Sequence, residues 1–237
     1  MPIILSSPLN STIILPLVLP DNTPSLFEDF SSTSLLTAPS CWNRYIGLMP
    51  ASGTIATSAL TSTSSYWSIS SKTLDGVSSN MLRINLWSNS YKYWAVTPSI
   101  NLGTDLENPK QIAFSVAVTD YADSNPPEVA SPDDRFMVLV SRDNGATWNM
   151  ADGIVFADSD EDTEHNFADL TNHLQRYAYK LVDENDEPLT GTVRFAFYAE
   201  STVDNADNDL VVEDISVEEW SECPAPYNVS ISGITSS

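Results

Sequence analysis

The sequence has few of the residues on which many protein activities depend. Only two histidines, His165 and His173, occur in 237 residues, and no G-x-S-x-G, glycine-rich phosphate loop or HExxH motif is present. Only two cysteines, Cys41 and Cys223, occur, which are too few for a zinc site and lack C-x-x-C redox spacing. With so many acids, a pair of carboxylates that hydrolyses glycosides stays an alternative, but nothing in the sequence singles out two of them. The sequence therefore predicts a protein that is not an enzyme.

Basic residues are scarce as well, since ten Lys and Arg face 32 Asp and Glu and the formal net charge is −22. Such an acidic surface repels phosphate backbones, which excludes nucleic acid as the expected partner. The first hundred residues carry four acids and four bases, so 28 acids and six bases lie in the remainder. The same surface attracts cations, and calcium prefers oxygen ligands of this type.

Long hydrophobic runs are absent, and no membrane insertion is expected. Residues 1–20 have no charged side chain, but prolines at four positions and several polar residues interrupt the apolar pattern. A signal peptide would need a basic start and a small-residue cleavage site, and neither is clear. We interpret residues 1–24 as an extended segment or the tail of an upstream domain.

Short strands with period-two alternation fill the rest of the chain and predict an all-β fold. The clearest expected strands are residues 26–30, 66–70, 81–87, 93–96, 112–119, 135–141, 176–182, 193–199 and 210–217. Residues 167–176 form the best expected helical turn. A chain of this length hides roughly 70% of its unfolded surface, which is enough for one large sandwich domain.

The stretch 135–148, RFMVLVSRDNGATW, is the expected centre of the fold. Its first half is apolar on both faces, which is typical of a strand deep in a sandwich. Asp143-Asn144-Gly145 predicts a tight hairpin turn, and the stretch 141–148 fits the Asp-box pattern S-x-D-x-G-x-T-W. We expect Asp143 to cap backbone N–H groups of the turn and Trp148 to pack over the hairpin. Sialidases carry several such boxes, whereas this chain has one, so the motif indicates a structural device.

Two groups of residues suggest ligand sites, each with a structural alternative. Glu28 and Asp29 near the first strand, and Glu213 and Asp214 in the last, could meet at a calcium ion if those strands are adjacent. Acidic edge residues also discourage edge-to-edge strand pairing, and that alternative stays open here. The second group is aromatic and surrounds a turn, where exposed rings could stack on sugars: Trp87, Tyr91, Tyr93 and Trp94. Alternation places Trp94 in the core instead.

Several motifs in order resemble the cleaved-adhesin or choice-of-anchor J family, which is related to MAM-type jelly rolls and to the haemagglutinin-adhesin domains of gingipains. The motifs are LFEDF from residue 26, PSCWNRY from 39, YWAVTPSINLG from 93, DDRFMVLVSRDNGATW from 133, and VRFAFYAE from 193 followed by LVVEDISV from 210. The resemblance covers residues 25–220. Residues 221–237 resemble a linker and the start of a fibronectin type III module.

The resemblance implies a jelly-roll β-sandwich of the galactose-binding-like kind, made of two antiparallel sheets. Family members are non-catalytic adhesion modules secreted or displayed by anaerobic gut and oral bacteria. Carried over by position, a structural calcium would bind Glu28 and Asp214, with Asp29 and Asp134 as weaker additions. Glu213-Asp214 replaces the family's usual Asp-Asp, and residues 157–188 are longer and more acidic than usual. Spacing alone leaves Cys41 and Cys223 as either a disulfide or two thiols, and the resemblance favours the disulfide.

The expected function is an extracellular or cell-surface module of a bacterial protein that binds glycan or a host or matrix protein. Trp87, Tyr91 and Tyr93 are the candidate ligand-binding residues, and Cys41, Cys223, Asp143 and Trp148 the candidate structural ones. A fibronectin type III-like domain is the expected neighbour in the chain. The alternatives are a spacer domain that only positions its neighbours and an accessory domain of a glycoside hydrolase.

Overall fold

The computed structural model describes residues 25–88, 92–121, 123–128, 134–157, 165–202 and 207–221. Nearly all the regular structure in these ranges is β-strand, and the only helices are three short 3-10 turns. They are η1 (Thr57–Ala59), η2 (Met150–Asp152) and η3 (Phe167–Asp169). In the part of the chain described, no helix has the length and apolar character needed to span a membrane.

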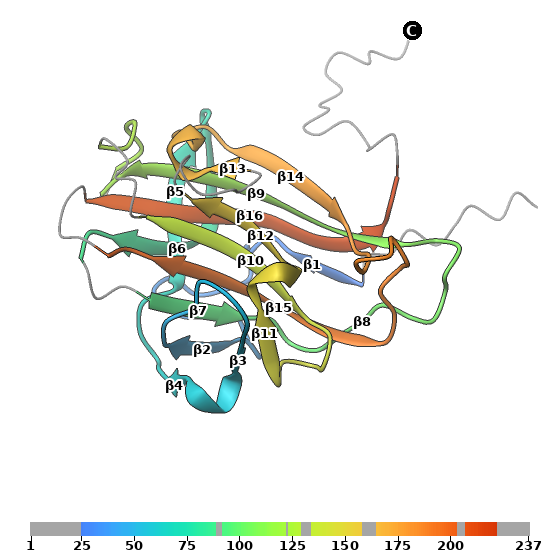
Figure 1. Ribbon diagram of the computed structural model, residues 1–237. Helices are drawn as coiled ribbons and strands as arrows, with labels where there is room; N and C mark the ends of the chain where they lie inside the picture. The colour runs from blue at the N-terminus through green and yellow to red at the C-terminus, as the bar shows by residue number, and fades with distance from the viewer. Residues whose placement is uncertain are drawn as a thin grey trace, which may run out of the picture.

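The first of two large sheets, sheet A, contains the long central strands of the chain (Figure 1). Its order is β14-β9-β16-β6-β5, and β1 pairs with the second half of β16. The strands are β1 (Leu26–Glu28), β5 (Ser68–Leu74), β6 (Val77–Leu86), β9 (Lys110–Asp120), β14 (Gln175–Lys180) and β16 (Asn208–Glu219). All of these pairings are antiparallel.

The second large sheet, sheet B, has the order β13-β12-β10-β15-β7-β2-β4, with β8 paired to β15. Its pairings are antiparallel except for the short parallel pair of β12 and β13. The strands are β2 (Asn43–Ile46), β4 (Thr61–Ser62), β7 (Lys92–Val96), β8 (Ile100–Asn101), β10 (Arg135–Ser141), β12 (Gly153–Ala157), β13 (His165–Asn166) and β15 (Thr192–Glu200). The two sheets face each other, which confirms the predicted all-β jelly-roll sandwich.

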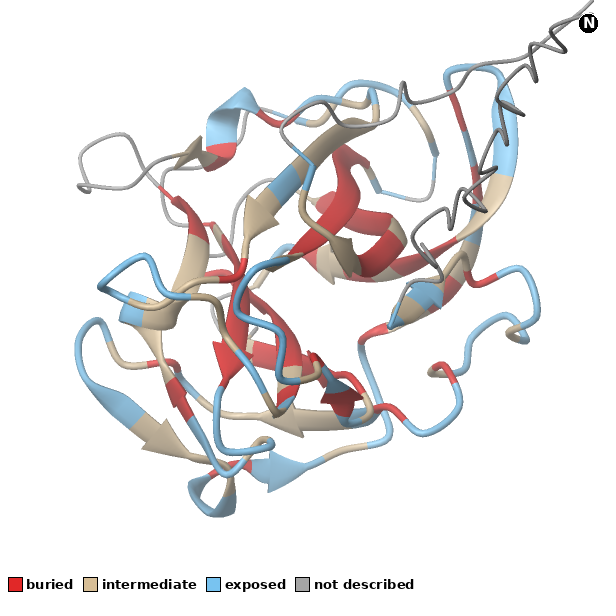
Figure 2. Ribbon diagram, turned by 90° about the vertical axis from the view of Figure 1, so that its right-hand side faces the viewer, coloured by how far each residue is buried: buried red, intermediate tan, exposed pale blue. Residues whose placement is uncertain are grey.

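The main hydrophobic core lies between the two sheets. Its largest side chains are aromatic and include Phe114 of β9 with Phe136, Phe156 and Phe197 of sheet B. The Phe114 ring meets each of these three rings edge-on, with centroids 6.1 to 6.5 Å apart. Full burial of such a side chain stabilises the fold by roughly 1.5–3 kcal/mol. Figure 2 shows the buried segments inside the sandwich, with exposed segments concentrated in the connecting loops.

A third layer covers the outer face of sheet B. Trp148 of β11 (Thr147–Asn149) pairs with Ile55 of β3 (Thr54–Ala56), and these strands form a two-stranded sheet. The ring of Trp148 packs against Trp94 at 5.9 Å, and both side chains are buried. The predicted β10–β11 hairpin is therefore wrong. Thr147 and Trp148 extend as expected, but their partner is β3, because Trp148 reaches an apolar surface on the outer face of β7.

The expected helical turn over residues 167–176 is also mostly wrong. Only Phe167–Asp169 winds into a 3-10 turn, and β14 already begins at Gln175. The backbone between these two elements is hydrogen-bonded to sheet A, since the Val118 N–H donates to the Thr171 carbonyl at 2.9 Å. Tertiary pairing thus overrides a weak local helical preference.

Candidate functional site

One end of sheet A presents polar side chains on its outward face. The inward face of β6 is apolar there and is made by Leu82, Ile84 and Leu86. Strand alternation therefore directs Arg83 and Asn85 to the opposite face. Asp209 of β16 pairs in register with Asn85, so its carboxylate joins the same face. These residues come from strands that are distant in sequence and adjacent in the sheet.

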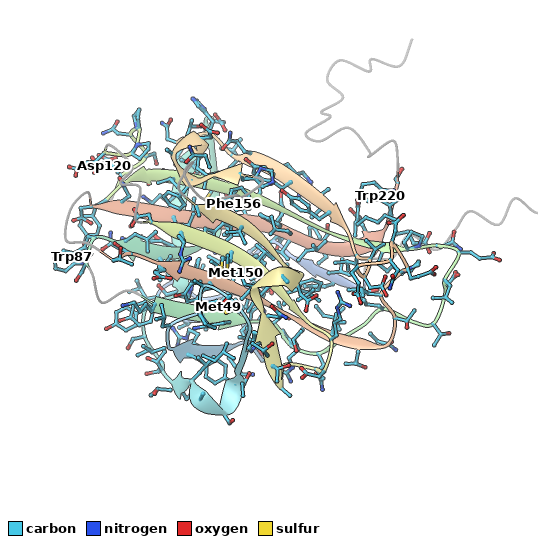
Figure 3. All side chains as sticks on the ribbon, viewed as in Figure 1. Met49, Trp87, Asp120, Met150, Phe156 and Trp220 are labelled. Carbon is cyan, nitrogen blue, oxygen red and sulfur yellow. The ribbon has the colours of Figure 1, made fainter. Side chains whose placement is uncertain are left out.

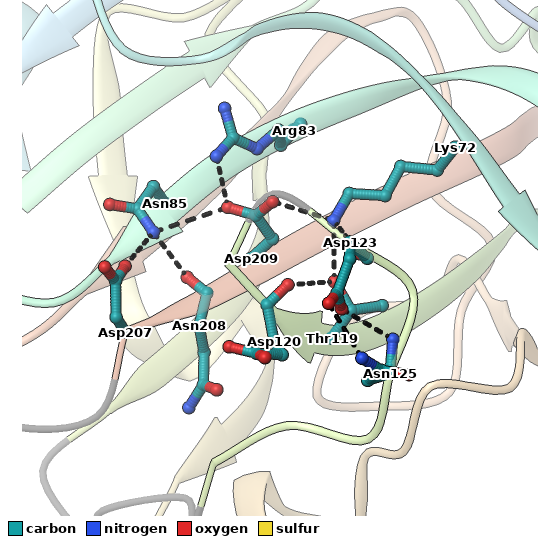
Figure 4. A network of polar contacts seen from close by, with 10 residues as sticks. All are labelled: Lys72, Arg83, Asn85, Thr119, Asp120, Asp123, Asn125, Asp207, Asn208 and Asp209. Carbon is teal, nitrogen blue, oxygen red and sulfur yellow. Dashed lines mark hydrogen bonds and ion pairs between the residues drawn. The ribbon is translucent and has the colours of Figure 1, made fainter.

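The centre of this face is the buried carboxylate of Asp209, which two cations neutralise (Figure 4). Lys72 Nζ lies 2.8 Å from its Oδ2, and Arg83 Nη2 lies 2.5 Å from its Oδ1. Lys72 also donates to Thr119 Oγ1 at 2.8 Å and to the Asp123 carbonyl. A buried charge is tolerated only when it is paired and hydrogen-bonded, and Asp209 meets that condition.

Asn85 extends the network toward the end of the sheet. Its Nδ2 donates to Asp207 Oδ1 at 2.7 Å, to the Asn208 carbonyl at 3.0 Å and to Asp209 Oδ1 at 3.3 Å. The buried Nε of Arg83 has no hydrogen-bond partner among the described residues. These contacts hold the donors and acceptors of the face in place, and together they form its floor.

Two half-exposed aromatic side chains stand at the edges of this floor. Trp87 follows β6 and is 47% exposed, and Tyr121 follows β9 and is 50% exposed. Asn208 pairs with Leu86 on one side and with Asp120 on the other, so the aromatics that follow these two residues lie at the same end of the sheet. Figure 3 labels Trp87 and Asp120 at this end. They are separated by two strand spacings, roughly 10 Å. The Arg83 guanidinium lies 5.4 Å from the centroid of the Tyr121 ring, which orients that ring.

We name Trp87, Tyr121, Arg83, Asn85 and Asp207 the aromatic–polar face. Aromatic rings offer flat apolar surfaces, and the floor between them offers directed hydrogen bonds. This combination suits a ligand with one apolar surface and many hydroxyl groups. The Asp209 carboxylate below the face is paired with both Lys72 and Arg83.

The three predicted ligand-binding aromatics have different outcomes. Trp87 is half exposed at the edge of the face, as a sugar-stacking residue must be. The prediction for Tyr93 is wrong, because it is 4% exposed and the Tyr66 ring stacks on it at 3.6 Å. Tyr93 lies on the inward side of a strand whose two faces are both covered, so Trp94 is buried too. Tyr91 lies outside the described residues.

Tyr121, Arg83, Asn85 and Asp207 were not predicted as site residues. The alternation of residues 81–87 places Arg83, Asn85 and Trp87 on one face, and that signal is visible in the sequence. Asp207 and Tyr121 join this face only through the pairing of β16 with both β6 and β9. That pairing cannot be read from local patterns.

The predicted metal residues are partly brought together. β1 pairs with β16 so that Glu28 lies opposite Ile215, which makes Asp214 its near neighbour across the strands. A β-bulge between Glu213 and Ser216 interrupts β16 here, and Asp214 has a φ of 50°. Asp134 is different, because it precedes β10 in sheet B and is buried there.

The carboxyl groups around this bulge influence one another. Burial raises the pKa of Glu28; the hydrogen bond from the Phe30 N–H opposes this effect, and the charge of Asp29 adds to it. Burial also raises the pKa of Glu213; the Ser79 side chain opposes this by a hydrogen bond, and Asp214 and Asp29 add to it. A cation would relieve this repulsion.

The carboxylates at the bulge do not form a three-ligand metal site by themselves. In the ranges that the structure covers, no group of three or more His, Cys, Asp or Glu side chains has an arrangement that could hold a metal ion. The carboxylates near the bulge therefore share an electrostatic environment without converging as three ligands on one point. Calcium also accepts backbone carbonyl and water oxygens, so two carboxylates can contribute to a site.

Two of the predicted structural residues, Asp143 and Trp148, make specific contacts at the turn after β10. Asp143 Oδ1 accepts hydrogen bonds from the N–H groups of Ala146 and Thr147, and Oδ2 accepts from Thr147 Oγ1 at 2.6 Å. The Trp148 indole N–H donates to Thr57 Oγ1 at 2.7 Å, which ties the turn to η1. Cys41 is exposed and forms no disulfide with any residue that the structure describes, so its pairing with Cys223 stays a prediction. Cys223 and the expected fibronectin-like start lie outside the described residues.

No protein-family model and no curated protein sequence matches the chain. Among solved structures, the chain is similar to the K1 cleaved adhesin domain of Lys-gingipain from Porphyromonas gingivalis W83. That match has 10% identity and a TM-score of 0.42, over 81% of this chain and 96% of that one. The K3 cleaved adhesin domain of the same protein matches with 15% identity and a TM-score of 0.41, over 83% and 98%.

A xylan-binding module, CBM15, matches with 11% identity and a TM-score of 0.37, over 80% of this chain and 99% of that chain. At these identities and TM-scores the comparisons assign neither a family nor a ligand to the present chain.

Proposed function

We propose that this domain is a non-catalytic binding module whose aromatic–polar face takes carbohydrate. The observation that carries the proposal is the placement of Trp87 and Tyr121 on either side of a hydrogen-bonding floor. Sugar rings have C–H faces that pack on aromatic rings and hydroxyl groups that both donate and accept. Asn85, Arg83 and Asp207 supply partners of both kinds.

The charge of the chain narrows the ligand to neutral glycans. A net charge of −22 repels sulfated or uronic-acid polymers over distances of about 8–10 Å at physiological salt. Asp207 at the face adds to this repulsion locally. We expect neutral hexose or pentose oligosaccharides to bind and acidic ones to bind more weakly at low salt.

The proposal is tested by a glycan array followed by calorimetric titration of the best oligosaccharide. Trp87→Ala and Tyr121→Ala should each weaken binding about tenfold or more, since a stacked ring contributes roughly 0.5–1.5 kcal/mol beyond the area it buries. Leu106→Ala, which truncates a residue that is 60% exposed elsewhere, serves as the matched control and should bind as the wild type does. If both aromatic variants bind the glycan normally, the face is not the site.

The proposal includes a location outside the cell and a role in adhesion. The ordered sequence motifs that resemble secreted adhesins support an extracellular or cell-surface setting, in which the module would attach its parent protein to glycan or to a glycosylated host protein. A complete lack of binding to glycans and matrix proteins would instead leave a spacer domain.

We also propose that calcium binds at the β1–β16 bulge, with Glu28 and Asp214 as ligands. The raised pKa values of Glu28 and Glu213 support this, because a bound cation would offset the burial and the neighbouring carboxylates that raise them. An ion at one hundred times its Kd would stabilise the fold by about 2.7 kcal/mol. Calcium should therefore raise the Tm by several degrees, Glu28→Gln should abolish the response, and Glu107→Gln should preserve it. A melting curve that chelation leaves unchanged would refute the site.

A further inference from the structure

A groove opens between the two sheets on the side opposite to β5 in the order of sheet A. It lies between β12 of sheet B and β14 of sheet A and has a volume of about 990 Å³. Among the described residues, β14 pairs only with β9, and β13 covers β12 only at Phe156 and Ala157. The sheets therefore separate at this edge and leave a groove that is lined by side chains of the core.

Apolar side chains from both sheets make the floor of this groove. They are Ile112, Val138, Val140, Ile154, Leu181 and Phe195. Tyr179 of β14 forms a side wall, and its hydroxyl is hydrogen-bonded to His165 Nε2. The floor and wall belong to paired strands, so the cavity is preformed. Its size and apolar lining are those of a small-molecule site.

Both basic side chains at the mouth of the groove, Arg142 and Lys180, are paired with carboxylates. Arg142 lies 2.6 Å from Asp152 and 3.5 Å from Glu184, and Lys180 lies 3.3 Å from Asp186. The carboxylate of Asp183 accepts hydrogen bonds from the N–H groups of Asn185 and Glu187. An anion would find both basic side chains of the groove lining already ion-paired, and any charged ligand would lose hydration on entry. The net charge of the chain further disfavours anions.

We propose that this groove is a second binding site, distinct from the aromatic–polar face, and that it takes an uncharged amphiphile. The apolar part of the ligand inserts between the sheets onto Val138 and Ile154, and a hydroxyl or amide head stays at the mouth. The Arg142–Glu184 pair crosses the mouth from the turn after β10 to the turn after β14. Glu184 is 78% exposed, so this pair is weak and yields to an entering ligand.

Nile red, a neutral dye whose fluorescence rises in apolar surroundings, serves as the probe on the full chain. Ile154→Trp fills the groove from β12, and Leu189→Trp fills it from the segment between β14 and β15; both positions are partly buried. Each variant should weaken dye binding at least tenfold while the cooperative melting transition is retained. Val77→Trp places the same side chain at an exposed position and should bind the dye normally. Normal dye binding by both groove variants would overturn the site.

The head group is tested by displacing the dye with 1-decanol, decanoate and decyltrimethylammonium below their aggregation concentrations. Decanol should displace the dye at a concentration at least tenfold lower than either charged analogue. Equal or better displacement by a charged analogue would overturn the assignment of an uncharged ligand. Trp87→Ala should leave dye binding unchanged and Ile154→Trp should leave glycan binding unchanged, so each proposed site can fail without the other.

Discussion

Replacing Asp143 tests whether one exposed carboxylate holds the turn after β10. Desolvation raises the pKa of this carboxyl, but hydrogen bonds from the side chains of Ser141 and Thr147 and from the N–H groups of Thr147 and Ala146 outweigh it and lower the pKa from 3.8 to about 2. A drop of this size corresponds to about 2.4 kcal/mol at most. Because Asp143 is exposed, solvent screening reduces the expected contribution to about 1 kcal/mol.

Asp143→Asn keeps an acceptor oxygen and removes the charge, so it should lower the free energy of unfolding by about 1 kcal/mol at pH 7. Asp143→Ala also removes the acceptors for the turn and should cost about 2 kcal/mol. Glu107→Ala, an exposed acid for which the structure shows no side-chain hydrogen bond, should change the stability by less than 0.5 kcal/mol. Urea unfolding followed by tryptophan fluorescence measures all three.

The dependence on pH distinguishes the charge from other effects. A carboxyl whose pKa is lowered by folding stabilises the native state above its unfolded pKa, and this stabilisation is lost as the pH falls toward the folded pKa. The difference between wild type and Asp143→Asn should therefore be constant from pH 7 to pH 5 and shrink between about pH 4 and pH 2. An undiminished difference at the acid end, or no difference at pH 7, would refute the reasoning.

Three further perturbations probe the sandwich. Lys72→Met leaves the buried Asp209 with Arg83 alone and should lower the free energy of unfolding in urea by about 3 kcal/mol. Lys180→Met, at an exposed pair, should lower it by under about 0.5 kcal/mol. Equal losses of stability in the two variants would contradict the burial argument. Glu213→Gln should raise the Tm in EDTA near neutral pH and should flatten the fall in stability as the pH rises. The reason is that an acid whose pKa is raised by folding favours the native state below its unfolded pKa. This effect is lost as the pH rises through the folded pKa. Gly145→Ala should cost more than Gly76→Ala in chemical unfolding: both have φ near +80°, but only at Gly145 would an added Cβ meet a neighbour, Arg194 Cδ at 2.7 Å, and a larger loss at Gly76 would argue against that contact.

Most strands could be located from sequence, because burial on one or both faces leaves a period-two or continuous apolar pattern. Residues 112–119 were expected as a buried strand, and β9 spans Lys110–Asp120 with nine consecutive buried residues. The partner of a strand is a different matter. Trp148 was expected to close a hairpin, yet it leaves β10 to cover Trp94, and no local pattern encodes that choice.

For the candidate sites too, local patterns were informative and the pairing of distant strands was not. The calcium hypothesis requires the first and last strands of the sandwich to lie side by side, and β1 does pair with β16. Tyr93 was misjudged because an aromatic near a turn looks the same in sequence whether its strand is covered on one face or on two. The groove could not be predicted from the sequence for a related reason. It forms where the edges of the two sheets separate, and no residue type marks that place.

The pairing of β1 with β16 has a mechanical consequence. The two strands are antiparallel, so Ser25 and the end of β16 leave the sandwich at the same edge, where the Ser25 N–H donates to the Val217 carbonyl. Tension applied between these two points would load the backbone bonds of β1 one after another, as in opening a zipper, instead of shearing them together. Resistance to such a pull would then depend on whatever fastens Glu28, the last residue of β1, to the bulge in β16.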